Sequence, residues 1–234
     1  MKIIFACAGN QTRWNNYMNY NKHLVPINGM PLLKRNINLF KKILNIDTYY
    51  VSIRNENMKP IYNVDDNIIF YIPDNIPEGE PSCKTLLPFI NSCNDDVLLL
   101  LGDVIYSEDC VKKINDAITN QSFNVFGRKR ASNITSCKWG ELFAFYIPVA
   151  FKPEFTKAVN MADYLYKRRY LSRFSGWELI SYIYVTNKTT KNIQKEIKRV
   201  QDIRLFPESF IEIDDTTEDF DFPSDYDSYL TRKI

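Results

Sequence analysis

Two cations follow the first apolar segment of the chain at a short distance. Residues 3–8 form an apolar run that stops at Gly9, and Arg13 and Lys22 come soon after it. Small residues at the end of a buried strand let a ligand approach the backbone closely. Backbone N–H groups in such a loop bind phosphate oxygens, and a fixed arginine and lysine neutralise charge that develops during transfer. This pattern indicates phosphate chemistry at the end of a first strand.

A carboxylate follows a second apolar segment. Residues 97–101 are apolar throughout, which is typical of a central strand buried on both faces, and the run ends in Gly102-Asp103. Asp103 is well placed there to hold a metal ion. The alternative is an ordinary turn or cap residue, since Gly-Asp after a strand is a common turn sequence.

The segments around the two cations resemble the opening of the sugar-phosphate nucleotidyltransferases. The family pattern is G-x-G-T-R followed by P-K-x-L-x-P-x-x-G-x-P, and the chain reads G-N-Q-T-R over 9–13 and N-K-H-L-V-P-I-N-G-M-P over 21–31. Gln11 replaces the second glycine, and Asn21 replaces the proline before the lysine. A side chain at position 11 narrows the space above a triphosphate and restricts the loop backbone.

The resemblance implies a reaction and a cofactor. A nucleoside monophosphate would pass from an NTP, CTP or UTP by preference, to a sugar phosphate or similar small phosphorylated acceptor, with release of pyrophosphate. Arg13 and Lys22 would be the catalytic cations. Mg²⁺ would be held by Asp103 and by Asp215 in the acidic stretch 211–221, with Asp214 as the adjacent alternative. The alternative interpretation of Asp215 is a helix N-cap.

The resemblance also implies positions for the two substrates. Trp139 and Glu141 would line the acceptor pocket, with core packing as the alternative for Trp139. The single histidine, His23, is interpreted as structural, because an ionised phosphate needs no general base. The basic run 128–130 is either an acceptor clamp or, preferably, a solvated loop. The nucleotide would lie against Ala8, Gly9, Asn10, Gln11, Thr12, Ser82 and Gly102, where Ser82 is equally suited to cap a helix.

The elements that carry these residues predict an α/β protein. Strand, helix and strand follow one another from the N-terminus, which indicates a right-handed parallel crossover. A length of 234 residues suits one α/β domain, which we expect over 1–234, or a domain with a small subdomain. The resemblance implies a Rossmann-like three-layer α/β/α sandwich with a mostly parallel, mixed sheet. Strands are expected at 49–53, 68–72, 97–101 and 123–127, and an antiparallel edge strand within 139–146. Helices are expected at 32–43, at 109–118 and at 164–184, where Gly176 interrupts the last one. The basic segment 188–204 is expected to be a solvated helix face.

Composition narrows the classes of partner. A net charge of +2 gives no broad electrostatic footprint for nucleic acid. The five cysteines show no C-x-x-C spacing, which favours reduced thiols over a zinc site. We find no leader and no apolar run long enough to span a bilayer, so we expect a cytoplasmic protein without membrane contact. An oligomer is compatible with the sequence.

Two other functions fit the same fold. A glycosyltransferase that uses a nucleotide sugar commonly carries D-x-D after the central strand, but this chain has Asp103-Val104-Ile105. A non-catalytic nucleotide-binding module is the second, and Gln11 is the residue that favours it.

Overall fold

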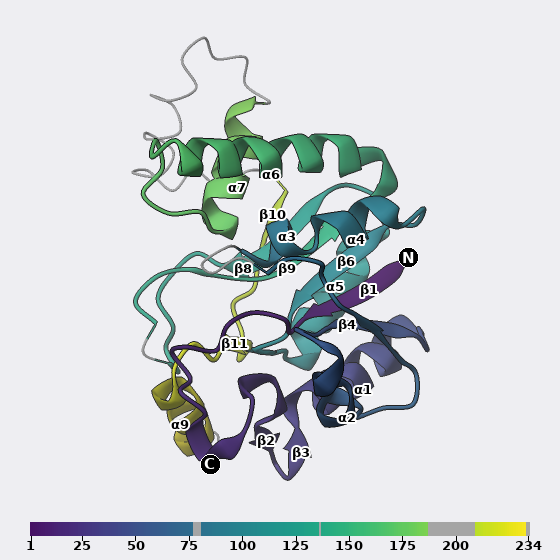
Figure 1. Cartoon of the computed structure of the whole chain (residues 1–234). Helices are drawn as coiled ribbons and strands as arrows, with labels where there is room; N and C mark the ends of the chain where they lie inside the picture. Colours follow the sequence, from purple (N-terminus) through teal and green to yellow (C-terminus); the bar gives the residue numbers. More distant parts are fainter. Residues whose placement is uncertain (77–80, 136, 187–208, 233–234) are drawn as a thin grey trace.

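A seven-stranded sheet runs through the middle of the computed structural model, which describes residues 1–76, 81–135, 137–186 and 209–232 (Figure 1). The strand order is β10-β8-β9-β6-β1-β4-β5. Strand β9 runs antiparallel to both β6 and β8, and the other neighbouring pairs are parallel. The strands are β1 (Lys2–Ala6), β4 (Tyr49–Ser52), β5 (Ile68–Tyr71), β6 (Val97–Leu101), β8 (Asn124–Arg128), β9 (Glu141–Ile147) and β10 (Phe210–Glu212).

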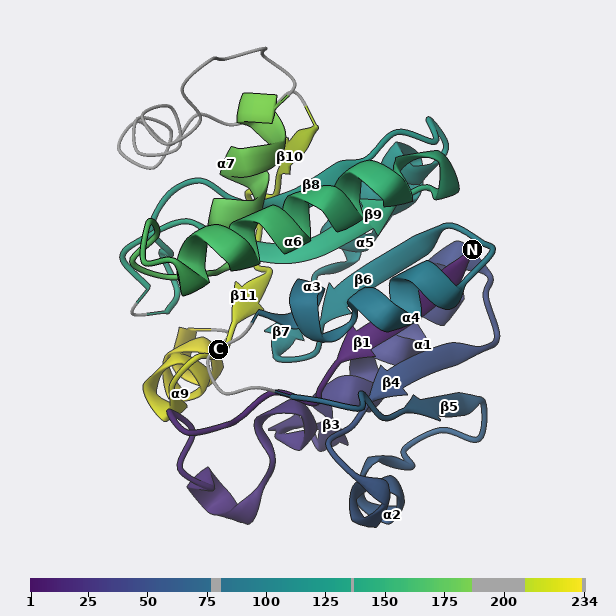
Figure 2. The same cartoon turned by 45° about the horizontal axis from the view of Figure 1, so that its top comes forward.

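Helices cover both faces of the sheet, which confirms the predicted three-layer sandwich. Successive side chains of a strand point to opposite faces. In β1, Ile3 and Phe5 pack on the face covered by α1 (Leu32–Leu44) and α5 (Glu108–Ile118), whereas Ile4 packs on the other face. Figure 2 shows that other face with its helices in front. They are α3 (Ser82–Thr85), α4 (Leu87–Ser92), α6 (Lys152–Lys167) and α7 (Gly176–Thr186).

Short elements gather beyond the carboxyl ends of β1 and β6. Strand β7 (Val104–Ile105) pairs with β11 (Glu218–Asp219), and β2 (Pro26–Ile27) pairs with β3 (Met30–Pro31). The other helices of the described residues are α2 (Lys59–Tyr62), α9 (Pro223–Arg232) and the 3-10 turns η1 (Tyr17–Asn19), η2 (Lys22–Leu24), η3 (Glu56–Met58) and η4 (Val149–Phe151). Among the described residues, no helix combines the length and the apolar character needed to cross a membrane.

Two expected elements differ from the structure. Strand β9 lies inside the sheet rather than at its edge, because β8 pairs on its outer side and β10 adds beyond β8. The helix expected over 164–184 is two helices. The first, α6, begins earlier, at Lys152, with a proline in its first turn, and the left-handed Arg169 (φ 60°) follows its end. The basic segment 188–204 lies outside the described residues.

Gly102 packs between the two central strands. Its N–H donates to the Ala6 carbonyl at 3.2 Å. A Cβ at this position would lie 2.8 Å from that same oxygen and would also overlap the Cys7 sulfur. A backbone oxygen held in a sheet cannot move aside, so position 102 accepts only glycine.

This packing predicts that Gly102→Ala lowers the free energy of unfolding by about 1–3 kcal/mol, the usual cost of overpacking. Gly9→Ala is the matched control, because no atom lies within 4 Å of a Cβ at Gly9. We expect that control to stay within about 0.5 kcal/mol of the parent. Urea unfolding followed by circular dichroism measures both. Equal free energies of unfolding in the two variants would show that the close packing at Gly102 does not restrict the residue at this position.

Candidate active site

Three carboxylates converge just beyond β6. Asp103 follows the end of that strand, and β11 pairs antiparallel with β7 so that Asp219 lies opposite Val104. The Phe220 N–H donates to the Asp103 carbonyl at 3.1 Å. Carboxylate oxygens of Asp103, Asp219 and Asp221 all lie within 4.8 Å of one another.

The sequence Asp219-Phe220-Asp221 explains why two of these acids face the same way. Side chains alternate along an extended segment. Phe220 is fully buried, with its ring against Tyr226 and Tyr229 of α9. The two flanking aspartates therefore point to the opposite side, toward Asp103. This D-x-D alternation is the local sequence signal that these two acids carry.

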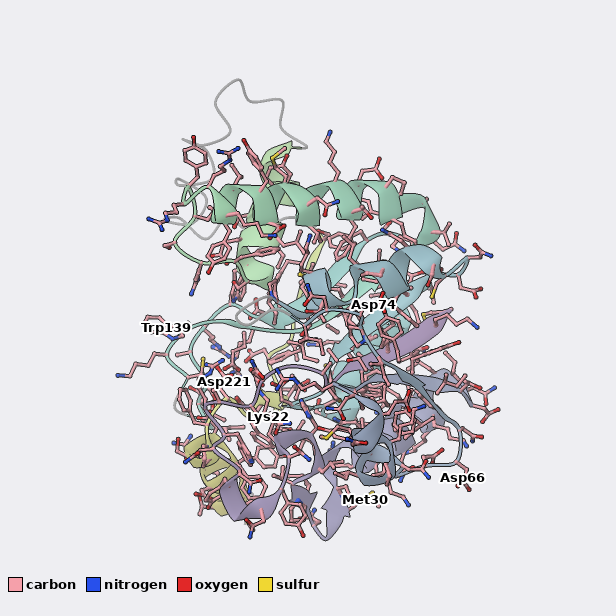
Figure 3. All side chains as sticks on the ribbon, in the orientation of Figure 1. Lys22, Met30, Asp66, Asp74, Trp139 and Asp221 are labelled. Atoms are coloured by element: carbon pink, nitrogen blue, oxygen red, sulfur yellow. The ribbon has the colours of Figure 1, made fainter. Side chains whose placement is uncertain are left out.

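Both predicted cations reach the carboxylates. The Lys22 ammonium forms an ion pair with Asp103. The Arg13 guanidinium contacts Asp221 at 2.6 Å and lies over the Phe222 ring. Lys22 and Asp221 are both near the centre of the molecule in Figure 3. The side chain of Lys22 is 12% exposed and that of Arg13 is 59% exposed, so Arg13 is the more accessible of the two to a ligand.

The loop that joins the cations is tied to α9. Trp14 is buried, its indole N–H donates to the Tyr20 carbonyl at 2.9 Å, and its ring packs against Tyr226. The Tyr17 hydroxyl donates to the Asp227 carboxylate at 3.0 Å. The left-handed backbone of the loop is one that asparagine tolerates better than most residues. The residues with positive φ there are Asn15, Asn16, Met18 and Asn19.

The acid cluster carries more negative charge than its surroundings neutralise. Burial, together with repulsion from Asp103 and Asp221, raises the pKa of Asp219 well above its usual value. Burial also raises the pKa of Asp221, although Arg13 opposes the shift. At Asp103 burial acts in the same direction, but Lys22 outweighs it and the pKa is lowered.

One oxygen of this cluster has no hydrogen-bond donor. Oδ1 of Asp219 is buried without a partner, and an unpartnered buried acceptor is costly. A hard divalent cation prefers oxygen ligands such as these carboxylates. The donor set, the excess negative charge and the orphaned oxygen all fit a divalent cation.

Asp215, the second metal ligand predicted from the sequence, is not among the three clustered carboxylates. Its Oδ1 accepts the Thr217 N–H at 2.8 Å, in a turn that precedes β11. That turn packs against the start of α5, where the Thr217 hydroxyl accepts the Ser107 N–H at 3.0 Å. The pairing of β11 with β7 brings the later aspartates to Asp103 instead. Asp214 is paired with Arg130 on the surface.

The predicted nucleotide residues differ in exposure and in local structure. Gly9 is exposed, with open space above its Cα. Asn10 and Thr12 are exposed beside it, whereas Ala8 is buried. Ser82 is the first residue of α3, and Pro81 rather than Ser82 occupies the cap position. The Gln11 side chain folds back and forms hydrogen bonds with Asn21 and Lys22.

The predicted acceptor residues have different environments. Trp139 is 63% exposed, at the periphery in Figure 3, so it does not pack in the core. Glu141 is buried, and its carboxylate contacts Arg128 at 2.8 Å. Arg128 is itself buried and also binds Glu218 through two hydrogen bonds, which corrects the preferred solvated interpretation of this arginine. Burial and the nearby Glu218 raise the pKa of Glu141 to about 7, against the opposing effect of Arg128.

Known proteins share this fold at low identity. The solved structure of UDP-glucose pyrophosphorylase complexed with UDP-glucose aligns with a TM-score of 0.59 and 11% identity, covering 99% of this chain and 98% of that one. CTP:phosphocholine cytidylyltransferase from Streptococcus pneumoniae aligns with a TM-score of 0.53 and 13% identity, covering 100% and 99% of the two chains. At such identities the likeness concerns the fold alone.

Sequence comparison identifies the family. The bifunctional protein GlmU of Methanococcus aeolicus is 27% identical over 121 residues, which are 51% of this chain and 29% of the relative, so the chain spans less than a third of that protein. Residues 3–173 match the family model of the MobA-like NTP transferase domain. Because the match covers most of the chain, including both cations and Asp103, this protein belongs to the MobA-like NTP transferase domain family of nucleotidyltransferases.

Proposed function

We propose that the chain transfers a nucleoside monophosphate from CTP or UTP to a sugar phosphate or similar small phosphorylated acceptor, with release of pyrophosphate. The observation that carries the proposal is the convergence of Arg13, Lys22 and three carboxylates beside the open backbone of Gly9. The pyrimidine preference is supported by the names of the similar structures, which include UDP-glucose and CTP.

In the proposed reaction an oxygen of the acceptor phosphate attacks the α-phosphorus of the NTP. The bond between the α-phosphorus and the oxygen bridging to the β-phosphate breaks, and pyrophosphate leaves with that electron pair. The exposed Arg13 stabilises the leaving pyrophosphate, and Lys22 stabilises the attacking and transferring oxygens. Catalysis therefore consists of positioning and charge stabilisation.

No general base is required, since the acceptor phosphate is already ionised at neutral pH. His23 fits a structural role. It is buried, its Nδ1 lies 2.8 Å from the Tyr62 hydroxyl, and burial lowers its pKa to about 3. The imidazole therefore stays neutral at the pH at which the phosphates are charged.

Asp103, Asp219 and Asp221 would hold the divalent cation, which we propose to be Mg²⁺. When bound, the cation supplies positive charge to the phosphate oxygens. The carboxylates also keep the two protein cations in place before substrate arrives, because Asp103 pairs with Lys22 and Asp221 pairs with Arg13.

The activity is tested by incubating the protein with each of the four common NTPs, Mg²⁺ and either glucose 1-phosphate or phosphocholine. We expect pyrophosphate release only when NTP and acceptor are both present, and fastest with CTP or UTP. Separate incubation with UDP-glucose tests the rival activity. Release of UDP without any added pyrophosphate would support a glycosyltransferase, and no turnover in any mixture would support a non-catalytic module.

The metal site predicts that Asp219→Asn weakens Mn²⁺ binding by at least about tenfold. Removing a group that only orients a metal ligand already lowers metal affinity by about 10–100-fold, and Asp219 would be a ligand itself. Asp103→Asn should have a similar effect. Asp215→Asn is the matched control, because it removes one negative charge four residues away and outside the cluster. Titration followed by electron paramagnetic resonance measures binding without substrate. Equal losses in Asp215→Asn and Asp219→Asn would contradict the assignment.

The two cations predict a large effect on turnover. Arg13→Ala and Lys22→Ala should each lower kcat by about 10²–10³, the range seen when one preorganised donor is removed. Lys112→Ala removes an exposed lysine of α5 and should leave turnover unchanged. Initial rates of pyrophosphate release measure all three. If both site variants lose less than about threefold, or roughly 0.7 kcal/mol of barrier, the loop is not the phosphate site.

A further inference from the structure

We infer that Gln11 is a positioning residue that holds the backbone of Lys22, and that Gln11 and Asn21 act as a matched pair. The inference rests on the proposed function insofar as Lys22 serves phosphate transfer. In this role Gln11 neither contacts the nucleotide nor obstructs the site.

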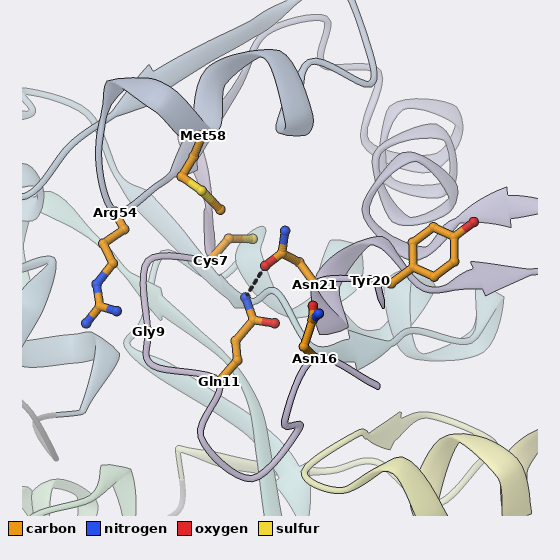
Figure 4. A pocket seen from close by; sticks show the side chains of 8 residues that line it. All are labelled: Cys7, Gly9, Gln11, Asn16, Tyr20, Asn21, Arg54 and Met58. Atoms are coloured by element: carbon orange, nitrogen blue, oxygen red, sulfur yellow. Dashed lines mark hydrogen bonds between the residues drawn. The ribbon is translucent and has the colours of Figure 1, made fainter. Parts of the chain in front are cut away.

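The contacts of the Gln11 amide define its orientation. Its Oε1 accepts the backbone N–H of Lys22 at 2.7 Å, and its Nε2 donates to Oδ1 of Asn21 at 3.1 Å (Figure 4). Since the backbone N–H can only donate, the carbonyl end of Gln11 must face Lys22 and the NH₂ end must face Asn21. The two side chains that depart from the family pattern therefore bind each other.

This arrangement caps the segment that carries the lysine. Lys22 is the first residue of the 3-10 turn η2, so its N–H has no partner within that turn. Asn21 occupies the cap position, but its side chain makes no capping hydrogen bond and accepts from Gln11 instead. Gln11 supplies the missing acceptor from ten residues earlier in the loop.

The same amide reaches the structural histidine through a tyrosine. The Gln11 Nε2 lies 3.5 Å from the Tyr62 hydroxyl, which is 2.8 Å from Nδ1 of His23. Gln11 thus contacts the residues on either side of the lysine: Asn21 directly and His23 through Tyr62.

The direction of the side chain distinguishes positioning from obstruction. Gln11 and Gly9 line the same cavity of about 270 Å³, but the Gln11 amide is directed to Asn21 and Lys22, and no atom lies within 4 Å of a Cβ at Gly9. A proline at 21 would restrict the loop through the backbone alone, whereas a glycine at 11 would leave its backbone free. Here two side-chain amides provide that restraint, in a loop that also contains several left-handed residues.

The decisive variant is Gln11→Met, which keeps the volume of the side chain and removes both hydrogen bonds. We expect amide hydrogen exchange at Lys22, followed by NMR, to become at least about tenfold faster. We expect kcat to fall about tenfold or more, with KM for the NTP within twofold, because a small displacement of a catalytic group slows the chemical step. Gln11→Glu retains an acceptor for the Lys22 N–H and should keep its exchange slow.

Tyr146→Phe provides the matched control for a lost hydrogen bond. The Tyr146 hydroxyl donates to Asp96 at 2.7 Å, at the opposite end of β6 from Asp103. This variant should alter neither exchange at Lys22 nor the kinetic constants. Asn21→Ala completes a double-mutant cycle, and it should have little further effect once Gln11 is methionine.

The alternatives have different signatures. A rise in KM with unchanged kcat in Gln11→Met would make Gln11 a nucleotide ligand, and tighter nucleotide binding would make it an obstruction; either result overturns the inference. Unchanged exchange at Lys22, or additive effects of the Gln11 and Asn21 variants, would overturn it as well. If the wild-type protein transfers no nucleotide, the proposed function fails. The role of Gln11 is then still decided by hydrogen exchange at Lys22 and by the double-mutant cycle measured as free energies of unfolding.

Discussion

Like charges held close together in a partly buried space are the constraint on which this site depends. Asp103, Asp219 and Asp221 share a volume so small that their oxygens lie within 4.8 Å of one another. Such an arrangement is unfavourable unless positive charge is supplied at the same place. Lys22 and Arg13 supply part of it, and the surrounding structure must hold both cations against the acids.

A second buried charge group lies beside the first and helps to hold it. Arg128 at the end of β8 binds Glu141 of β9 and Glu218 of β11, and all three side chains are buried. A buried arginine is tolerated when carboxylates and other acceptors satisfy its donors, and losing one partner is costly. Because Glu218 precedes Asp219, this ion pair also fixes the start of the segment that carries two of the site acids.

The parts of the fold that bury long apolar segments could be predicted from the sequence, and the contacts between distant short segments could not. Val97–Leu101 and the amphipathic helix from Leu32 have patterns that admit one interpretation. That Arg13 and Lys22 lie at one end of the sheet could be predicted, because both belong to the loop that follows the first strand. Asp219 and Asp221 depend instead on the register of β11, which is two residues long and shows no periodicity beyond D-F-D. Glu141 was assigned to the acceptor pocket from the family resemblance, and nothing in the nearby sequence reveals that Glu218 joins it on Arg128.

The ion pair between Arg13 and Asp221 has a consequence for how the molecule is assembled. The two residues are separated by 208 positions in the chain, so closing this contact costs more chain entropy than any pairing among β1, β4 and β5. The central strands can associate while the later part of the chain is still being synthesised, because Asp219 and Asp221 follow all of these strands in the sequence. The acidic centre is therefore completed after the central strands that support it. Lys22 can pair with Asp103 before then, but Arg13 lacks Asp221 and is exposed to solvent and to anionic ligands during that interval.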